Sequence, residues 1–225
     1  MVAIRAGQAA IKAVIWDFGG VLTSSPFEAF ARYEAELGLP TDFIRKVNSL
    51  NPDTNAWAQF EQARIDTAQF DALFRAESTA LGHNVGGSDV LALLSGELRP
   101  SAISALRAIG HAYKIGCITN NVPIGDGPGM AGSVQKAHAV RAVMDLFDHV
   151  LESSKVGIRK PDPRIYALMC EALDVAPSNC VYLDDLGINL KPARQMGMTT
   201  LKVESEGQLL RDLGAILGRE FSLVQ

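Results

Sequence analysis

Acidic and polar residues stand at the carboxyl ends of three short apolar runs in this chain of 225 residues. Asp17 follows the first run, Thr119 and Asn120 end the second, and Asp184 and Asp185 follow the third. Such runs are typical of buried strands in a parallel sheet, which binds ligands beyond the carboxyl ends of its strands. Three carboxylates in one crevice repel one another unless a cation is present, and Mg²⁺ leaves coordination positions open for phosphate. The pattern therefore predicts phosphate chemistry assisted by Mg²⁺.

A lysine stands in a rigid context further along the chain. Lys160 lies in the sequence R-K-P-D-P at residues 159–163, where Pro161 restricts Lys160 to extended conformations and Pro163 can begin a helix. An ammonium group presented in this way can neutralise a carboxylate and a phosphate as a point charge. Lys155 is a competing lysine nearby, but it lacks this context. We therefore take Lys160 as the candidate cation of the site.

Alternating strand and helix patterns must position these residues. Strand-like runs lie at residues 13–16, 114–119, 180–183 and 199–203. Helical patterns at residues 100–109, 163–173 and 189–196 precede or separate the later strands. This alternation predicts an α/β fold with a doubly wound, mostly parallel, Rossmann-like sheet.

One long stretch interrupts the alternation. Between Ser25 and Leu98 the pattern indicates only amphipathic helices, which are expected to begin near Ser25, Thr41, Asp66 and Ser88. Their aromatic stripes are interpreted as core. An all-helical insert entered just after the first strand suggests a separate cap over the sheet. We expect an α/β core domain of residues 1–23 and 99–225 and a helical cap of residues 24–98.

Four motifs in this order resemble the haloacid dehalogenase-like (HAD) superfamily, whose most common activity is phosphatase. They are D-F-G-G-V-L at 17–22, C-I-T-N at 117–120, R-K-P-D-P at 159–163 and Y-L-D-D-L-G-I-N at 182–189. The insert is similar in position to the helical C1-type cap of the subfamily that includes the N-terminal phosphatase domain of soluble epoxide hydrolase. The resemblance covers nearly the whole chain and implies a hydrolase, with a small organic phosphate as the expected substrate.

The resemblance also assigns roles to individual residues. It implies that Asp17 attacks phosphorus and forms an aspartyl-phosphate that water then hydrolyses, while Lys160 holds Asp17 and the phosphate together. Thr119 and the Asn120 amide would hold the phosphoryl oxygens. The implied cofactor is Mg²⁺, and the implied metal site consists of Asp17, the backbone carbonyl of Gly19, Asp185 and, through bound waters, Asp184 and Asn189.

The chain departs from the family pattern at Gly19. Members of the family usually have a second aspartate at this position, two residues after the nucleophile, and it protonates the leaving oxygen. Glycine preserves the backbone carbonyl that would bind the metal, but it removes the proton donor. General acid catalysis typically contributes ~10²–10⁴-fold, so a phosphatase with this sequence is expected to be slow on poor leaving groups.

Two other functions stay open. One is a 2-haloacid dehalogenase, in which Asp17 would attack carbon rather than phosphorus. That chemistry needs no metal, so the retained pair Asp184 and Asp185 argues against it. The other is a non-catalytic member that binds a phosphorylated ligand or a partner, and Gly19 is its main support. Metal dependence separates the two enzymes, and covalent capture of Asp17 separates both from the binding protein.

Composition excludes several further classes of protein. With 21 basic and 25 acidic residues and a formal charge of −4, the chain has no electrostatic footprint for nucleic acid and no basic run for an anionic membrane. No stretch approaches the ~18 apolar residues of a membrane span, and the uncharged run at residues 6–11 is too short for a secretory signal. The three cysteines match neither a disulfide framework nor a zinc site and are expected to pack as small apolar residues. We expect a cytoplasmic protein.

Two segments are ambiguous in function. Trp57, Phe60 and Arg64 of the insert are candidates either to line a pocket or simply to pack. Residues 127–132 spell G-x-G-x-x-G, the pattern of a dinucleotide-binding loop. They do not directly follow a strand, however, and Pro128 interrupts the turn, so we interpret them as a mobile glycine-rich loop near the mouth of the site.

Overall fold

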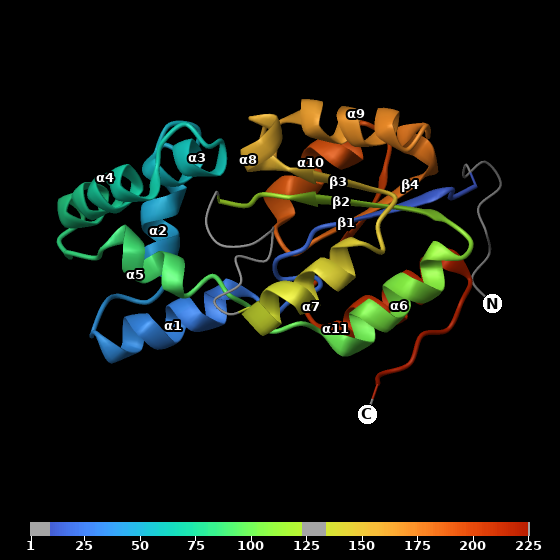
Figure 1. Ribbon diagram of the computed structural model, residues 1–225, viewed down its shortest axis with the longest axis horizontal. Helices are drawn as coiled ribbons and strands as arrows, with labels where there is room; N and C mark the ends of the chain where they lie inside the picture. The colour runs from blue at the N-terminus through green and yellow to red at the C-terminus, as the bar shows by residue number, and fades with distance from the viewer. Residues whose placement is uncertain (1–9, 123–133, 225) are drawn as a thin grey trace.

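A five-stranded parallel sheet forms the centre of the molecule (Figure 1). The computed structural model describes residues 10–122 and 134–224. The sheet has the spatial order β3-β2-β1-β4-β5. Its strands are β1 (Ala13–Trp16), β2 (Lys114–Thr119), β3 (His149–Glu152), β4 (Cys180–Asp184) and β5 (Thr199–Lys202).

The register brings the carboxyl ends of the central strands together. Trp16 at the end of β1 pairs with Cys117 of β2 on one side and with Leu183 of β4 on the other. The next residues, Asp17 and Asp184, therefore stand side by side at one edge of the sheet. The chain completes β1, β2 and β3 on one side of the sheet before it crosses to β4 and β5 on the other. Ligands bind in open α/β sheets at such a reversal of strand order, so this edge is the expected place for a site.

Helices cover both faces of the sheet, which confirms the predicted doubly wound fold (Figure 1). Val14 and Trp16 of β1 face one hydrophobic core, whereas Ala13 and Ile15 face another on the opposite side. The first core includes residues of helices α6 (Pro100–Gly110), α7 (Val134–Met144) and α11 (Glu206–Leu217). The second includes residues of α9 (Pro163–Ala172) and α10 (Gly187–Gln195), and the short helix α8 (Ser153–Val156) follows β3.

Five helices between β1 and α6 pack around a third core, which is rich in aromatic residues, beyond one end of the sheet (Figure 1). Phe70 is at its centre, stacked on Phe60 with ring centroids 4.7 Å apart and in contact with Trp57 and Phe74. The helices are α1 (Pro26–Glu36), α2 (Phe43–Ser49), α3 (Ala56–Glu61), α4 (Thr67–Ala80) and α5 (Gly87–Ala92). The division into core and cap domains at residues 24–98 stays a prediction.

Local sequence signals explain where these helices begin and end. Ser25 caps α1 by accepting a hydrogen bond from Phe27 N, and Pro26 occupies its first turn, as the sequence indicates. Asp66 caps α4 in a reciprocal pair with Gln69, a capping box that satisfies two backbone N–H groups. The stop of α1 near Gly38 coincides with a positive φ of 65° at that glycine, a backbone conformation that favours glycine.

The structure adds elements that the pattern did not predict: helices α7, α8 and α11 of the part around the sheet, a 3-10 turn at Pro177–Asn179, and the two discussed next, β3 and α3. Strand β3 is a four-residue edge strand whose sequence H-V-L-E begins and ends with polar residues, so it lacks the continuous apolar run of the other strands. Helix α3 has only six residues and begins at the capping residue Asn55. The helix expected from Ser88 to Leu98 is shorter than predicted, because α5 ends at Ala92. Leu50 and Leu73 of the insert do not join its core, since both are more than a third exposed.

Cys117, Cys170 and Cys180 are all buried and free, as expected for cysteines that pack as apolar residues. In the two described ranges, no helix combines the length and the apolar character needed to cross a membrane. The glycine-rich segment at residues 127–132 lies outside the described residues.

Candidate active site

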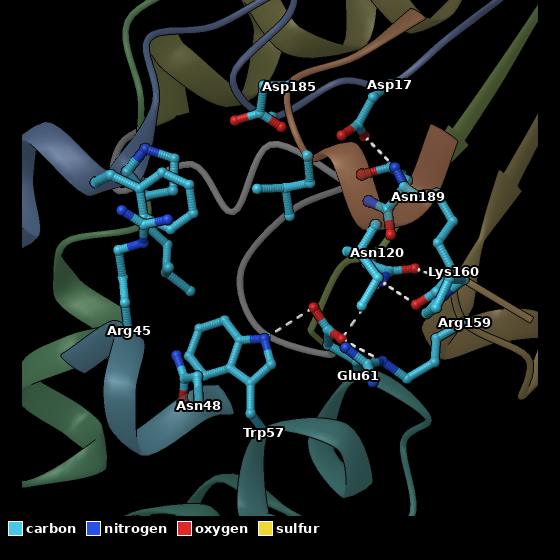
Figure 2. Close-up of a pocket in the computed structure, with 18 of the residues that line it drawn as sticks. Asp17, Arg45, Asn48, Trp57, Glu61, Asn120, Arg159, Lys160, Asp185 and Asn189 are labelled. Atoms are coloured by element: carbon cyan, nitrogen blue, oxygen red, sulfur yellow. Dashed lines mark hydrogen bonds and ion pairs between the residues drawn. The ribbon is translucent and has the colours of Figure 1, made fainter. Parts of the chain in front are cut away.

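A cavity of about 470 Å³ opens between the carboxyl edge of the sheet and helices α1, α2 and α3 (Figure 2). Residues predicted for the site line the part that belongs to the sheet and its loops: Asp17, Gly19, Thr119, Asn120, Lys160, Asp185 and Asn189. Side chains of the helical insert form the opposite wall. Its apolar or aromatic members are Pro26, Phe27, Phe30, Pro52, Trp57 and Leu94, and its polar members are Arg45, Asn48, Ser49, Asp53 and Glu61. The cavity therefore joins a charged floor to a wall that combines apolar and polar side chains.

Asp17 stands at the end of β1 and is 7% exposed. Its Oδ1 accepts hydrogen bonds from the backbone N–H of Phe18 at 2.7 Å and from Lys160 Nζ at 2.8 Å. Burial raises the pKa of Asp17 well above its usual range and the neighbouring carboxylates add to the effect, whereas the Lys160 ammonium opposes it. The negative charge on Asp17 thus depends on nearby cations.

Lys160 is the cation that meets this requirement within the described residues. Its side chain is 1% exposed, and its Nζ lies 2.8 Å from both Asp17 Oδ1 and Asp184 Oδ2. Burial alone would lower the pKa of Lys160, but the charges of the two carboxylates and their hydrogen bonds outweigh burial and raise that pKa. Lys160 therefore stays charged between the two acids. The peptide bond that joins it to Pro161 is cis.

Asp184 is fully buried, and several donors from the protein hold it. Besides Lys160, its Oδ2 accepts a hydrogen bond from the Tyr182 hydroxyl, and its Oδ1 accepts one from Leu186 N at 2.8 Å. Asn189 Nδ2 lies 3.1 Å from both Asp184 oxygens. Asp184 is thus fixed in position, and Asn189, the residue expected to act beside it, is one of the groups that fix it.

Asp185 is less enclosed and faces the cavity. Burial, followed by repulsion from Asp184, raises the pKa of Asp185 from 3.8 to about 6. Gly20 packs directly against this carboxylate: a Cβ at Gly20 would lie 2.2 Å from Asp185 Oδ2, and its φ is 75°. Glycine is favoured at position 20 for both reasons, because a Cβ would force the Asp185 carboxylate to shift and the positive φ would strain another residue.

Gly19 lines the cavity next to Asp17, and the space into which a side chain at this position would project is open. A Cβ built on Gly19 would have no atom within 4 Å. The departure from the family pattern is therefore not enforced by crowding. Thr119, at the end of β2, is buried and also lines the cavity.

Asn120 has a contact that sequence reasoning did not anticipate. Its side chain forms two hydrogen bonds with the backbone of Lys160: Oδ1 accepts from Lys160 N at 2.8 Å, and Nδ2 donates to Lys160 O at 3.0 Å (Figure 2). The carboxamide thereby holds the lysine segment against the end of β2. The position of Lys160 thus depends on both ends of the residue, its backbone and its ammonium group.

The three carboxylates form a group that could hold a divalent metal ion. Ligand oxygens of Asp17, Asp184 and Asp185 all lie within 4.8 Å of one another. Within this described cluster, the ammonium group of Lys160 contacts Asp17 and Asp184. When all three carboxylates are ionised, it leaves two negative charges to be balanced. Hard carboxylate oxygens with this charge excess fit Mg²⁺.

Two functional candidates were missed in the sequence. Glu61 of α3 is 6% exposed and lines the cavity, and it pairs with Arg159, the residue before Lys160, at 2.6 Å. Glu61 had no sequence signal of its own, because the helix that carries it is short. Of the three insert residues considered as candidates, Trp57 lines the cavity, Phe60 is buried in the aromatic core and Arg64 is exposed.

The sequence model of haloacid dehalogenase-like hydrolases matches residues 11–197, and the chain belongs to this family of hydrolases. Phosphatase MT3486 of Mycobacterium tuberculosis is 31% identical over 230 residues, which cover 92% of this chain and 97% of that protein. Mouse bifunctional epoxide hydrolase 2 is 30% identical, over 94% of this chain and 40% of its own length. Mouse acyl-CoA dehydrogenase family member 10 is 34% identical, over 95% of this chain but 20% of its own length. The chain thus spans two fifths or less of these two mouse relatives.

Solved structures agree with the fold. A HAD family enzyme of Bacteroides thetaiotaomicron, in complex with magnesium and inorganic phosphate, has a TM-score of 0.57 at 20% identity, over 87% of this chain and 95% of that one. L-2-haloacid dehalogenase of Xanthobacter autotrophicus, with chloropropionic acid covalently bound, also has a TM-score of 0.57, at 21% identity, over 96% of this chain and 91% of that one. At these identities the similarity establishes a shared fold.

Proposed function

We propose that the protein is a Mg²⁺-dependent phosphatase that hydrolyses a small organic phosphate through an aspartyl-phosphate on Asp17. The observation that carries the proposal is the position of Lys160 Nζ, 2.8 Å from both Asp17 and Asp184 at the floor of the cavity. A buried ammonium beside a buried carboxylate forms a site for an anion that must approach the carboxylate closely. The family relationship to phosphatases supports the same reading.

The residues that would hold Mg²⁺ are Asp17, Asp185 and the backbone carbonyl of Gly19. When bound, the metal supplies positive charge that offsets the repulsion between the phosphoryl oxygens and the attacking carboxylate. Asp184 and Asn189 would orient waters bound to the metal. The hydrogen-bond donors that hold Asp184 favour a positioning role for its carboxylate.

The first step transfers the phosphoryl group to the protein. An oxygen of the Asp17 carboxylate attacks phosphorus, the bond from phosphorus to the leaving oxygen breaks, and the electron pair stays on that oxygen. Lys160, Thr119 and the backbone N–H of Asn120 hold the phosphoryl oxygens. Water attacks phosphorus in the second step, and the bond between Asp17 and phosphorus breaks to release inorganic phosphate. Positioning and charge stabilisation supply most of the rate in such transfers.

Proton supply to the leaving group sets the substrate preference. Position 19 offers no acid, and in this proposal the leaving oxygen takes its proton from water. Substrates whose leaving group is stable as an anion, such as acyl or aryl phosphates, are therefore favoured over alkyl phosphates.

Helices α1, α2 and α3 suggest what the leaving group looks like. Phe27, Phe30 and Trp57 present apolar surface to the cavity, whereas Arg45 and Asn48 of α2 add polar groups on the same side (Figure 2). We infer an organic group with an apolar body and a polar edge. In this proposal residues 24–98 act as the cap that selects this group, and residues 1–23 and 99–225 are the catalytic core.

Release of phosphate from p-nitrophenyl phosphate and acetyl phosphate tests the proposal, measured with Mg²⁺ and with chelator. We expect turnover that stops when Mg²⁺ is removed. Chloride release from 2-chloropropionate in the presence of chelator would instead indicate a dehalogenase. Absence of turnover in all three assays, with retained binding of inorganic phosphate, would indicate a non-catalytic member.

A further inference from the structure

The Glu61 carboxylate joins the helical insert to the loop that carries Lys160. Its Oε2 accepts a hydrogen bond from Arg159 Nε at 2.6 Å, and its Oε1 accepts one from Trp57 Nε1 at 2.9 Å (Figure 2). The Glu61 side chain is 7% exposed and that of Arg159 is 19% exposed, so water screens this ion pair only weakly. A pair of this kind holds its two segments at a fixed distance.

Further contacts make the junction rigid. Arg159 Nη1 donates to the carbonyl of Pro52, also in the insert, at 2.9 Å, and Asn120 Nδ2 lies 3.5 Å from Glu61 Oε2. Helix α3, which carries Glu61, packs against α8 of the core. The insert therefore touches the core where the chain approaches Lys160.

A continuous set of contacts leads from this junction to the nucleophile. Arg159 directly precedes Lys160, whose backbone is held by Asn120 at 2.8 Å and 3.0 Å. The Lys160 side chain then contacts Asp17 Oδ1 at 2.8 Å. A displacement of α3 would move Arg159 and, with it, the backbone from which the ammonium reaches Asp17.

We propose that Glu61 is a positioning residue: by holding Arg159, it makes the placement of Lys160 beside Asp17 depend on how helix α3 sits against the core. Trp57 lines the cavity on the same helix and is hydrogen-bonded to Glu61, so the surface that meets the substrate and the carboxylate that holds the lysine loop move together. The inference rests on the proposed function, because Lys160 acts there on the phosphate.

The test compares Glu61→Gln with wild type and with Arg75→Gln. Glu61→Gln removes the charge at nearly constant size. Arg75→Gln breaks the ion pair between Arg75 and Asp71. This ion pair lies in the same insert, but neither of its residues lines the cavity. We expect kcat of Glu61→Gln to fall about 10–100-fold with acetyl phosphate and with p-nitrophenyl phosphate alike, with little change in KM, since small displacements of a positioning group cost rate.

Hydrogen exchange supplies a readout that does not depend on activity. The backbone N–H of Lys160 donates to Asn120 Oδ1, and we expect its exchange, followed by mass spectrometry of the peptide that contains it, to become about tenfold faster in Glu61→Gln. The control Arg75→Gln should match wild type in both measurements.

Unchanged hydrogen exchange and unchanged kcat in a folded Glu61→Gln protein would overturn the inference. A rise in KM confined to p-nitrophenyl phosphate would also overturn it, because this result would make Glu61 a substrate contact. If Glu61→Gln does not fold, Arg159→Lys replaces it: this variant keeps the charge, removes the fork that Glu61 and Pro52 hold, and should show intermediate changes. Wild type without turnover would refute the proposed phosphatase, while hydrogen exchange would still decide the role of Glu61.

Discussion

Replacing Gly19 with aspartate should supply the proton donor that is missing at this position. A Cβ at Gly19 meets no atom within 4 Å, and its φ is not among the positive values, so the backbone and the Cβ position accept a side chain there. Gly19 lines the cavity beside Asp17, so an added carboxyl group would reach the space that a leaving oxygen occupies.

The size of the effect depends on the leaving group. A positioned general acid contributes ~10²–10⁴-fold to a step that requires proton transfer, and little to a step whose leaving group is already a stable anion. We therefore expect Gly19→Asp to raise kcat on an alkyl phosphate at least ~10²-fold, and kcat on p-nitrophenyl phosphate less than tenfold. The alkyl-to-aryl ratio of kcat is the quantity to measure, because differences in active protein concentration cancel in it.

The matched control is Gly19→Asn, which has nearly the same size but donates no proton of comparable acidity. It should leave the ratio at the wild-type value. The reasoning is refuted if folded Gly19→Asp, saturated with Mg²⁺, shows an unchanged or lower alkyl-to-aryl ratio, or if Gly19→Asn raises the ratio equally.

Three further outcomes follow from the carboxylate cluster. Gly20→Ala should weaken Mg²⁺ binding at least ~tenfold in a calorimetric titration, since its Cβ would lie 2.2 Å from Asp185 Oδ2; unchanged affinity would contradict the packing described. Lys160→Met should lower the free energy of urea unfolding by about 3–5 kcal/mol at pH 7, because it leaves buried carboxylates without their cation. The loss should be smaller at pH 5, where those carboxylates can take up protons. A loss below about 1 kcal/mol at pH 7 would contradict this prediction. Without metal, Asp185 in the folded protein binds more protons than in the unfolded chain between pH 3.8 and about 6. The free energy of unfolding should therefore fall as pH rises through that window, and Mg²⁺ should raise Tm more at pH 7 than at pH 5. Asp185→Asn should remove most of this difference between the two pH values, and an unaltered pH dependence in that variant would refute the assignment.

The charged floor of the site was predictable because it depends on strand ends. Asp17, Thr119 and Asp184 each close a short apolar run, and in a parallel sheet such ends must meet at one edge. Lys160 was predictable from its proline neighbours. The structure brings all four to one cavity or its floor, in a sheet that contains the four predicted strands and one further strand, β3.

The contacts that cross between elements were not predictable. Glu61 belongs to a six-residue helix, and its proposed role depends on its hydrogen bond with Arg159, which is 98 residues away in sequence. The role of Asn120 in holding the Lys160 backbone likewise depends on a contact over 40 residues. Periodicity reports which face of an element is buried, but it carries no information on which distant polar group will be met there.

Strand β3 shows a different limit. Its residues His149 and Glu152 are polar, and as an edge strand with one neighbour it needs less apolar surface than the central strands. Four residues without a continuous apolar run give a weak strand signal in any window. The neighbouring strand, not the local sequence, determines its conformation.

The central claim is that Asp17 carries the phosphoryl group, and rapid acid quench during turnover tests it most directly. The protein would be mixed with p-nitrophenyl phosphate and Mg²⁺, quenched within the first turnover and digested, and the peptide containing Asp17 would be weighed by mass spectrometry. We predict a mass increase of one phosphoryl group on Asp17 in wild type, and neither this increase nor phosphate release in Asp17→Asn. Turnover by wild type without a phosphoryl group on Asp17, or phosphate release by Asp17→Asn at the wild-type rate, would contradict the account.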